Sequence, residues 1–192
     1  MATPTARAAG RRKRQARWAM AVDTRRCVGC HACVLSCKAE NDLPADGFRD
    51  WITTVTTGVF PHLAQEIRSE RCNHCANAPC VDCCPTGASH VGDGGIVLVD
   101  ADMCTGCKAC VASCPYDARF IHPEGYADKC TFCIHRVHRG LQPACVDICP
   151  TRALTFGDLN NADGDLSRLL ASRTHKTLRP ELGLEPNVFF LT

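Results

Sequence analysis

The sequence predicts an α+β fold of short strands and helices in which bound metal replaces much of the apolar core. Three observations support this expectation: 16 of the 17 cysteines fall into four motifs, aromatic residues make up only 6% of the 192 residues, and the segments with strand or helix character are short. A chain of this length forms one or two domains. Because large apolar side chains are few, we expect metal binding to supply much of the folding energy and the metal-free chain to be largely unfolded.

The most regular motif, at 104–115, has the spacing C-x2-C-x2-C-x3-C-P. This is the bacterial ferredoxin pattern, in which three thiolates on one tight loop hold three irons of a 4Fe-4S cluster while the fourth cysteine binds the neighbouring cluster. The motif therefore predicts a partner motif. Residues 72–85 supply it with the spacing C-x2-C-x4-C-x3-C-P.

A second pair of motifs surrounds the first pair in the chain. Residues 27–37 have the spacing C-x2-C-x2-C-x3-C, and residues 130–150 have the spacing C-x2-C-x11-C-x3-C-P. Four sets of four cysteines predict four 4Fe-4S clusters. They also predict two bacterial-type two-cluster ferredoxin modules, with the module of the inner motifs nested in sequence within the module of the outer motifs.

Disulfides and structural zinc are the alternative uses of a cysteine-rich chain. A disulfide framework suits short secreted chains, but it gives no reason for a repeated spacing that ends in proline. Zinc is bound tetrahedrally, usually by two C-x2-C pairs joined by a longer loop, and the x11 gap at 134–144 taken alone resembles such a site. Three closely spaced cysteines would crowd one zinc ion, so the cluster interpretation is favoured.

The formal charge of the chain, +2, counts the ligand cysteines as neutral. An oxidised 4Fe-4S cluster with four thiolates carries roughly −2, so four clusters would bring the net charge to about −6. Positive side chains beside the ligands would raise the reduction potential of a cluster. The basic residues that lie close to ligand cysteines in the sequence are Arg25, Arg26, Arg71, Lys108, Lys129 and Arg136.

Strand and helix signals lie between the motifs and beyond the last one. Runs of β-branched and aromatic residues predict strands, a turn between two apolar runs predicts a hairpin, and leucines at helical spacing predict a helix. The tail beyond Pro180 reads as extended, and its apolar residues 188–191 would need a partner to cover them. The expected elements are a strand at 48–57, a hairpin at 91–99 around Asp93-Gly94-Gly95, helical turns after the Cys-Pro endings at 86–88 and 151–153, and a helix around 166–170.

Residues 1–17 form a basic, polar arm. The pair Arg11-Arg12 invites a twin-arginine export interpretation, but no apolar region of about 7 to 15 residues follows it, so we expect no export signal here. The arm is expected to be solvated or to lie along a partner, with contact to anionic lipid as the alternative. No apolar run approaches about 18 residues, so no transmembrane helix is expected.

All four motifs in this order, together with residues 26–33, 149–154 and 180–188, resemble the iron-sulfur subunit of membrane-bound molybdopterin oxidoreductases, of the polysulfide, thiosulfate, tetrathionate and dimethyl sulfoxide reductase type. The resemblance covers about residues 20–192 and implies four 4Fe-4S clusters with crossed ligands. The implied ligands are Cys27, Cys30, Cys33 and Cys149 for cluster 1; Cys130, Cys133, Cys145 and Cys37 for cluster 2; Cys72, Cys75, Cys80 and Cys114 for cluster 3; and Cys104, Cys107, Cys110 and Cys84 for cluster 4.

The resemblance also implies a function and partners. The chain would relay electrons between an integral membrane subunit that binds quinone or quinol, facing the inner module, and a molybdopterin catalytic subunit, facing the outer module. Contact with the membrane would be indirect, and no nucleic acid partner is expected. The complex would lie outside the cytoplasm by co-export with its catalytic subunit, with the cytoplasmic face as the alternative. A soluble polyferredoxin or a hydrogenase-type electron relay is the alternative function.

This interpretation divides the chain into four parts. The basic N-terminal arm takes residues 1–20, and the inner ferredoxin module takes residues 67–119. The outer module combines 21–66 with 120–157, and a docking tail takes 158–192.

Cys83 is the one cysteine outside the four sets. We expect its thiol to be buried and inert, with an alternative ligand or an oxidation-sensitive thiol as the other interpretations. His31, His74 and His135 lie in or beside the motifs, but each set already has four cysteines, so histidine is not expected to bind iron. The sequence has no close carboxylate pair, phosphate-binding loop or nucleophile-base signature, so no catalytic site is expected.

Overall fold

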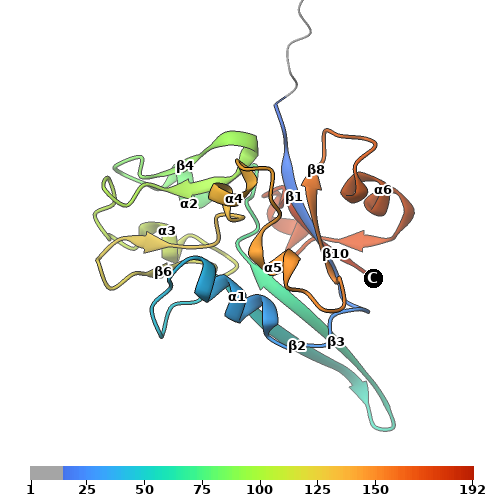
Figure 1. The fold of residues 1–192 in the computed structure, drawn as a ribbon. Coiled ribbons are helices and arrows are strands. Elements are labelled where there is room, and N and C mark those ends of the chain that lie inside the picture. Colours follow the sequence, from blue (N-terminus) through green and yellow to red (C-terminus); the bar gives the residue numbers. More distant parts are fainter. Residues whose placement is uncertain (1–14) are drawn as a thin grey trace, which may run out of the picture.

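The computed structural model describes residues 15–192 and shows an α+β fold of short strands and helices. A sheet and one helix, α6, lie on one side of the molecule, and the elements of the two inner cysteine motifs lie on the other (Figure 1). The prediction of a basic arm falls largely on residues 1–14, which lie outside the described residues, and residues 18–20 belong to a strand.

The main sheet joins the two ends of the described chain. Strand β1 pairs in parallel with β10, so that Met20 lies opposite Val188, and antiparallel with β8 on its other side. The expectation that residues 188–191 need a partner to cover them is wrong, because Val188 and Leu191 are fully buried in this sheet. The strands, in sheet order, are β8 (Leu154–Asp158), β1 (Trp18–Asp23), β10 (Val188–Leu191) and β9 (His175–Lys176).

The two faces of this sheet follow the period-two alternation of strand side chains. Met20 and Val22 face a core that also holds Phe132 and Phe156, whereas Ala19 and Ala21 face α6. Helix α6 (Asp165–Ser172) confirms the predicted helix, and its Leu166 is buried against the sheet.

A long hairpin projects from the body of the molecule (Figure 1). Its strands β2 (Asp50–Val59) and β3 (His62–Arg71) are paired over their whole length. The strand predicted at 48–57 is confirmed, but β3 was not predicted, because its polar sequence lacks the alternation that marks a half-buried strand. The hairpin delivers Arg71 next to Cys72, with Arg71 opposite Asp50.

Two smaller hairpins frame the inner motifs. The predicted hairpin is confirmed as β4 (Ser89–Val91) and β5 (Val97–Val99), joined through a 3-10 turn η1 (Asp93–Gly95). Gly94 has a φ of 66°, and a Cβ there would lie 2.2 Å from the Trp18 ring, so both the turn and its packing require glycine. The second hairpin pairs β6 (Phe120–Ile121) with β7 (Ala127–Asp128).

The short helices precede the Cys-Pro endings and do not follow them. Residues after the prolines form turns in which Gly87 and Arg152 have positive φ, so the helical turns predicted at 86–88 and 151–153 are wrong. A left-handed residue ends a helical path. The helices other than α6 are α1 (Ala32–Glu40), α2 (Pro79–Asp82), α3 (Ala109–Ala112), α4 (Ile134–Val137) and α5 (Ala144–Asp147), with a 3-10 turn η2 at Pro180–Leu182. Within residues 15–192, no helix is long and apolar enough to cross a membrane.

Candidate iron-sulfur cluster sites

Each motif begins with a Cys-x2-Cys loop whose residue before the second cysteine has a left-handed backbone. These residues are Gly29, His74, Gly106 and Phe132, with φ values of 67°, 44°, 64° and 50°. Glycine adopts this conformation without steric cost, whereas a side chain must be held in it. His74 and Phe132 are both buried and pack on each other, with ring centroids 3.8 Å apart. This contact links the second motif to the fourth.

The later cysteines of each motif lie on or just beyond a helical turn. Cys33 and Cys37 are both in α1, four residues apart and therefore on one face of the helix. In the other motifs the third cysteine lies in a short helix and the fourth follows it. The chain then turns so that the backbone N–H of Ser89 points to Cys84 Sγ at 3.3 Å, and that of Ala153 points to Cys149 Sγ at 3.2 Å.

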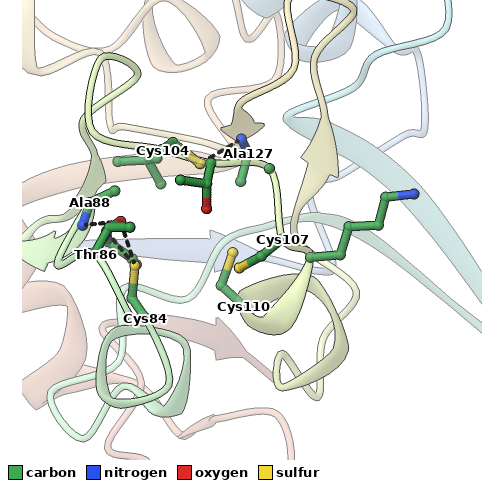
Figure 2. Close-up of a pocket in the computed structure, with 12 residues that line it drawn as sticks. Cys84, Thr86, Ala88, Cys104, Cys107, Cys110 and Ala127 are labelled. Carbon is green, nitrogen blue, oxygen red and sulfur yellow. Dashed lines mark hydrogen bonds between the residues drawn. The ribbon is translucent and has the colours of Figure 1, made fainter.

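Two pockets are each lined by four cysteines from two motifs. Figure 2 shows the first, where Cys84 of the second motif faces three cysteines of the third. Ala88, Val99 and Ala127 complete its apolar wall. We call the cysteines of this pocket group 4 (Cys84, Cys104, Cys107 and Cys110). The other pocket holds group 1 (Cys27, Cys30, Cys33 and Cys149).

Two further groups lie deeper in the protein. Burial raises the pKa of Cys75 to about 12, and the next causes are the neighbouring Cys72, Cys80 and Cys114, which with Cys75 form group 3. Burial likewise raises the pKa of Cys37, with added contributions from Cys130, Cys145 and Cys133, which with Cys37 form group 2. Helix α1 packs on α5, and this contact brings Cys37 of the first motif to the cysteines of the fourth.

The burial of these thiols has a chemical consequence. Burial raises the pKa of Cys33 to about 11 and that of Cys130 to about 12, so without a metal these cysteines are neutral thiols near pH 7. Iron is bound by the thiolate. Cluster binding must therefore release protons, and it supplies the positive charge that makes a buried array of thiolates stable.

The groups also carry hydrogen-bond donors suited to thiolates. The backbone N–H of Ala127 points to Cys104 Sγ, and that of Phe132 to Cys130 Sγ, each at 3.4 Å. Arg119 Nη2 lies 2.9 Å from Cys80 Sγ. Among residues 15–192, no three His, Cys, Asp or Glu side chains are grouped for a single metal ion. In groups 1 and 4, four sulfurs around one apolar space, with donors directed at them, fit a 4Fe-4S cluster.

The basic residues selected from the sequence differ in burial, and Arg136 is half-buried. Arg71 and Lys129 are buried, at 2% and 1% exposed, whereas Arg25, Arg26 and Lys108 are exposed. Sequence reasoning missed the other buried cation of this region. Arg119 lies five residues beyond Cys114, and it reaches Cys80 only through the fold.

The histidines and the extra cysteine that lie in or beside the motifs are placed at the edges of the cysteine groups. His74 Nδ1 accepts a hydrogen bond from the Val97 N–H at 3.1 Å, and burial lowers the pKa of His74 well below its ordinary value, so the ring is neutral. His135 pairs with Glu40 at 2.7 Å. Cys83 is half-buried and not buried as expected; its Sγ is 3.3 Å from Ser113 Oγ, and it lines neither of the two pockets.

Comparison with known proteins agrees with this geometry. Residues 63–159 match the model of a 4Fe-4S dicluster domain, and residues 24–40 match a 4Fe-4S binding domain. The chain is 43% identical to the B subunit of the Salmonella typhimurium tetrathionate reductase, over 91% of this chain and 72% of that protein. It is 41% identical to the B subunit of the Wolinella succinogenes polysulfide reductase, over 91% and 94%. The Haemophilus influenzae NrfC homolog is 44% identical, over 91% and 80%.

The protein belongs to the iron-sulfur subunits of the molybdopterin oxidoreductases. Membership of this family makes it an electron-transfer subunit rather than an enzyme with a catalytic site of its own. The alternative of a free-standing polyferredoxin is not favoured.

Proposed function

We propose that the chain holds four 4Fe-4S clusters, one in each cysteine group, and relays electrons between a quinone-binding membrane subunit and a molybdopterin catalytic subunit. The observation that supports this most is the convergence of four cysteines, from two motifs, on each of two separate pockets. The proposed ligands are those of groups 1 to 4: Cys27, Cys30, Cys33 and Cys149; Cys37, Cys130, Cys133 and Cys145; Cys72, Cys75, Cys80 and Cys114; and Cys84, Cys104, Cys107 and Cys110.

The same grouping supports two nested modules. Groups 1 and 2 exchange cysteines between the first and fourth motifs, so residues 21–66 and 120–157 would form the outer module. Groups 3 and 4 exchange cysteines between the second and third motifs, so residues 67–119 would form the inner module. Residues 158–192 would remain as the docking tail, although part of it completes the main sheet.

Electrostatic interactions across the groups support a linear order from group 1 to group 4. Arg71 interacts with Cys33 of group 1 and with Cys145 of group 2. Cys130 of group 2 interacts with Cys72 of group 3. Across the next gap, Arg119 interacts with cysteines of groups 3 and 4. When bound, each 4Fe-4S cluster supplies a site that takes up and gives up one electron.

The protein's own residues hold and shield this path. Groups 2 and 3 lie behind buried side chains such as Phe132 and Val97, which keep water away from the middle of the path. The two exposed cysteines are Cys30 of group 1 and Cys107 of group 4. Electrons would therefore enter and leave at the two end groups.

These exposed ends support the placement of the partners. Group 1 belongs to the outer module and would face the molybdopterin subunit, and group 4 belongs to the inner module and would face the membrane subunit. The subunit would be peripheral and held at the membrane by its partners. We place the complex outside the cytoplasm by co-export with the catalytic subunit, with the cytoplasmic face as the alternative.

Iron and acid-labile sulfide per chain, measured on anaerobically purified protein, test the cluster count. About sixteen of each are expected, together with interacting electron paramagnetic resonance signals on stepwise reduction. Stoichiometric zinc with little sulfide would mean that the chain is a zinc-stapled binding module. Size analysis of gently solubilised native membranes tests the partners, since a monomer there would contradict the proposed complex.

A further inference from the structure

Arg71 is a buried cation whose charge is balanced by a carboxylate. It lies between group 1 and group 2, where Nη1 donates to Cys145 Sγ at 3.2 Å. Its Nη2 is 3.1 Å from Asp50 Oδ2, and both side chains are buried. The pair therefore adds little net charge to its surroundings.

Arg119 is a buried cation without such a partner. Its Nη2 donates to Cys80 Sγ at 2.9 Å and to Ser89 Oγ at 2.8 Å. The cysteines that interact with it are Cys80, Cys72 and Cys110, which belong to groups 3 and 4. No Asp or Glu among residues 15–192 forms an ion pair with it. A guanidinium remains protonated in proteins, so a full positive charge lies in the gap between these two groups.

Two N–H groups of Arg119 also lack an acceptor within residues 15–192. Its Nε and Nη1 are buried and have no hydrogen-bond partner among the described residues. A buried donor without a partner destabilises the fold, and more so when the group is charged. The thiolates and sulfides of two bound clusters would supply both the missing acceptors and the missing negative charge.

Lys129 is the third buried cation of this region. It is 1% exposed, and its Nζ donates to the carbonyl oxygens of Val97 and Cys130. It interacts electrostatically with Cys72 and Cys80 of group 3, with Cys130 of group 2 and with Arg119. Lys129 is present in the wild type and in every variant of the experiment below, so the variants differ in sequence only at Arg119 or Ser89.

We propose that Arg119 is a potential-setting residue, which raises the reduction potentials of the clusters held by groups 3 and 4. This inference rests on the proposed four clusters. Reduction adds a negative charge to a cluster, and a fixed positive charge in a low-dielectric gap favours that state. Since Arg71 is neutralised by Asp50, groups 1 and 2 have no equivalent unbalanced guanidinium.

The test is a potentiometric titration of the full chain in its complex, followed by electron paramagnetic resonance, for wild type and Arg119→Gln. Two of the four midpoint potentials should fall in the variant, and the other two should stay in place. Unchanged midpoint potentials in an Arg119→Gln protein that holds all its clusters would overturn the inference.

Two control variants separate charge from hydrogen bonding. Arg119→Lys keeps the charge, and Ser89→Ala removes a hydrogen-bond partner without changing any charge. Both should keep the two midpoints well above those of Arg119→Gln. If Ser89→Ala lowers them as far as Arg119→Gln does, the charge is not the cause and the proposal fails.

Ser89→Asp provides a second route in case Arg119→Gln does not load its clusters. The new carboxylate would neutralise Arg119 while leaving the guanidinium in place, so the same two midpoints should fall. If the Ser89→Asp protein binds its clusters but keeps the wild-type midpoint potentials, Arg119 does not set those potentials. Iron and sulfide are measured on every sample, because a wild-type chain without about sixteen of each would refute the four-cluster proposal itself.

Discussion

The main sheet and the half of the molecule that holds the two inner cysteine motifs bury different kinds of side chain. The sheet buries Met20, Val22, Val188 and Phe190 in a continuous apolar cluster. The buried cluster of the inner half consists of three cysteines, three small aliphatic residues and no aromatic ring: Cys75, Cys80, Cys110, Ala78, Val97 and Ala127. Large apolar side chains thus dominate the cluster at the sheet, although it also includes Cys33, Cys72, Cys130 and Cys145, whereas half of the buried residues in the inner cluster are cysteines.

This difference indicates two sources of folding energy in one chain. Burying one large apolar side chain stabilises the fold by roughly 1.5–3 kcal/mol, and the sheet buries several such side chains. The inner half has few such side chains, and its thiols become ligands only when iron is present. Stability there should depend on metal, and in the sheet on packing.

Removal of iron should have the largest effect. Iron-free protein should lose most of its native far-ultraviolet circular dichroism, because metal binding and folding are coupled. In hydrogen exchange, the amides that remain slowest should lie in β1, β8 and β10, and protection over 72–130 should disappear. A cooperative thermal transition with native-like circular dichroism in the iron-free chain would refute this prediction.

Substitution in the sheet core should have the next largest effect. Phe190→Ala should destabilise the iron-loaded protein by about 3–5 kcal/mol, because Phe190 is 1% exposed and leaves a cavity. Val97→Ala in the inner half is the matched control and should cost about 2 kcal/mol, since it removes only two methyl groups. Anaerobic guanidinium unfolding followed by circular dichroism measures both. Equal losses of unfolding free energy in the two variants would contradict the proposed difference between the sheet and the inner half.

The link between the first and fourth motifs should contribute less. Glu40 of α1 accepts hydrogen bonds from His135 at 2.7 Å and from Arg136 at 2.9 Å. These contacts, with the His135 hydrogen bond the largest cause, lower the pKa of Glu40. Because the pair is partly exposed, Glu40→Gln should cost less than about 1 kcal/mol.

The same lowered pKa sets the pH dependence. The carboxylate stabilises the fold above its ordinary pKa of about 4.3, and this contribution is lost as the pH falls through the lower folded-state value. The difference in unfolding free energy between wild type and Glu40→Gln should therefore be greatest near pH 7 and should shrink below about pH 4. Glu181→Gln, at an exposed carboxylate, is the control. A difference that grows as the pH falls would contradict the assignment.

Cys83→Ala should have the smallest effect. The Cys83 thiol contacts Ser113 and packs beside the inner cluster of buried residues. Iron content should stay at the wild-type value, and stability should change by about 1 kcal/mol or less. The adjacent Cys84→Ala is the control, because it removes a proposed ligand and should lower the iron content. Loss of iron in Cys83→Ala would favour the alternative-ligand interpretation.

Sequence reasoning succeeded where the signal is local. The cysteine spacing, the hairpin around Asp93 and the helix at 165–172 each follow from residues close together in the chain, and the structure contains both elements. Strand β3 was missed because the outer part of its hairpin is exposed on both faces, so backbone pairing rather than an apolar face defines it.

The remaining misses are non-local. The parallel pairing of Met20 with Val188 joins the two ends of the described chain, and no short pattern marks either strand as the partner of the other. Arg119 was missed for the same reason, since only the fold brings it to Cys80. Charge next to a ligand in sequence was a mixed guide, because Arg71 and Lys129 are buried whereas Lys108 and Arg25 are exposed.

The pairing of β1 with β10 also determines when the chain can finish folding during synthesis. Strand β1 precedes all the proposed ligands in the chain, but its neighbours β8 and β10 both follow Cys149, the last of these ligands. Every ligand is therefore present before the sheet can close. A nascent chain that has acquired its iron still exposes the edges of β1, and closure of the sheet marks a subunit whose cysteines have all been made.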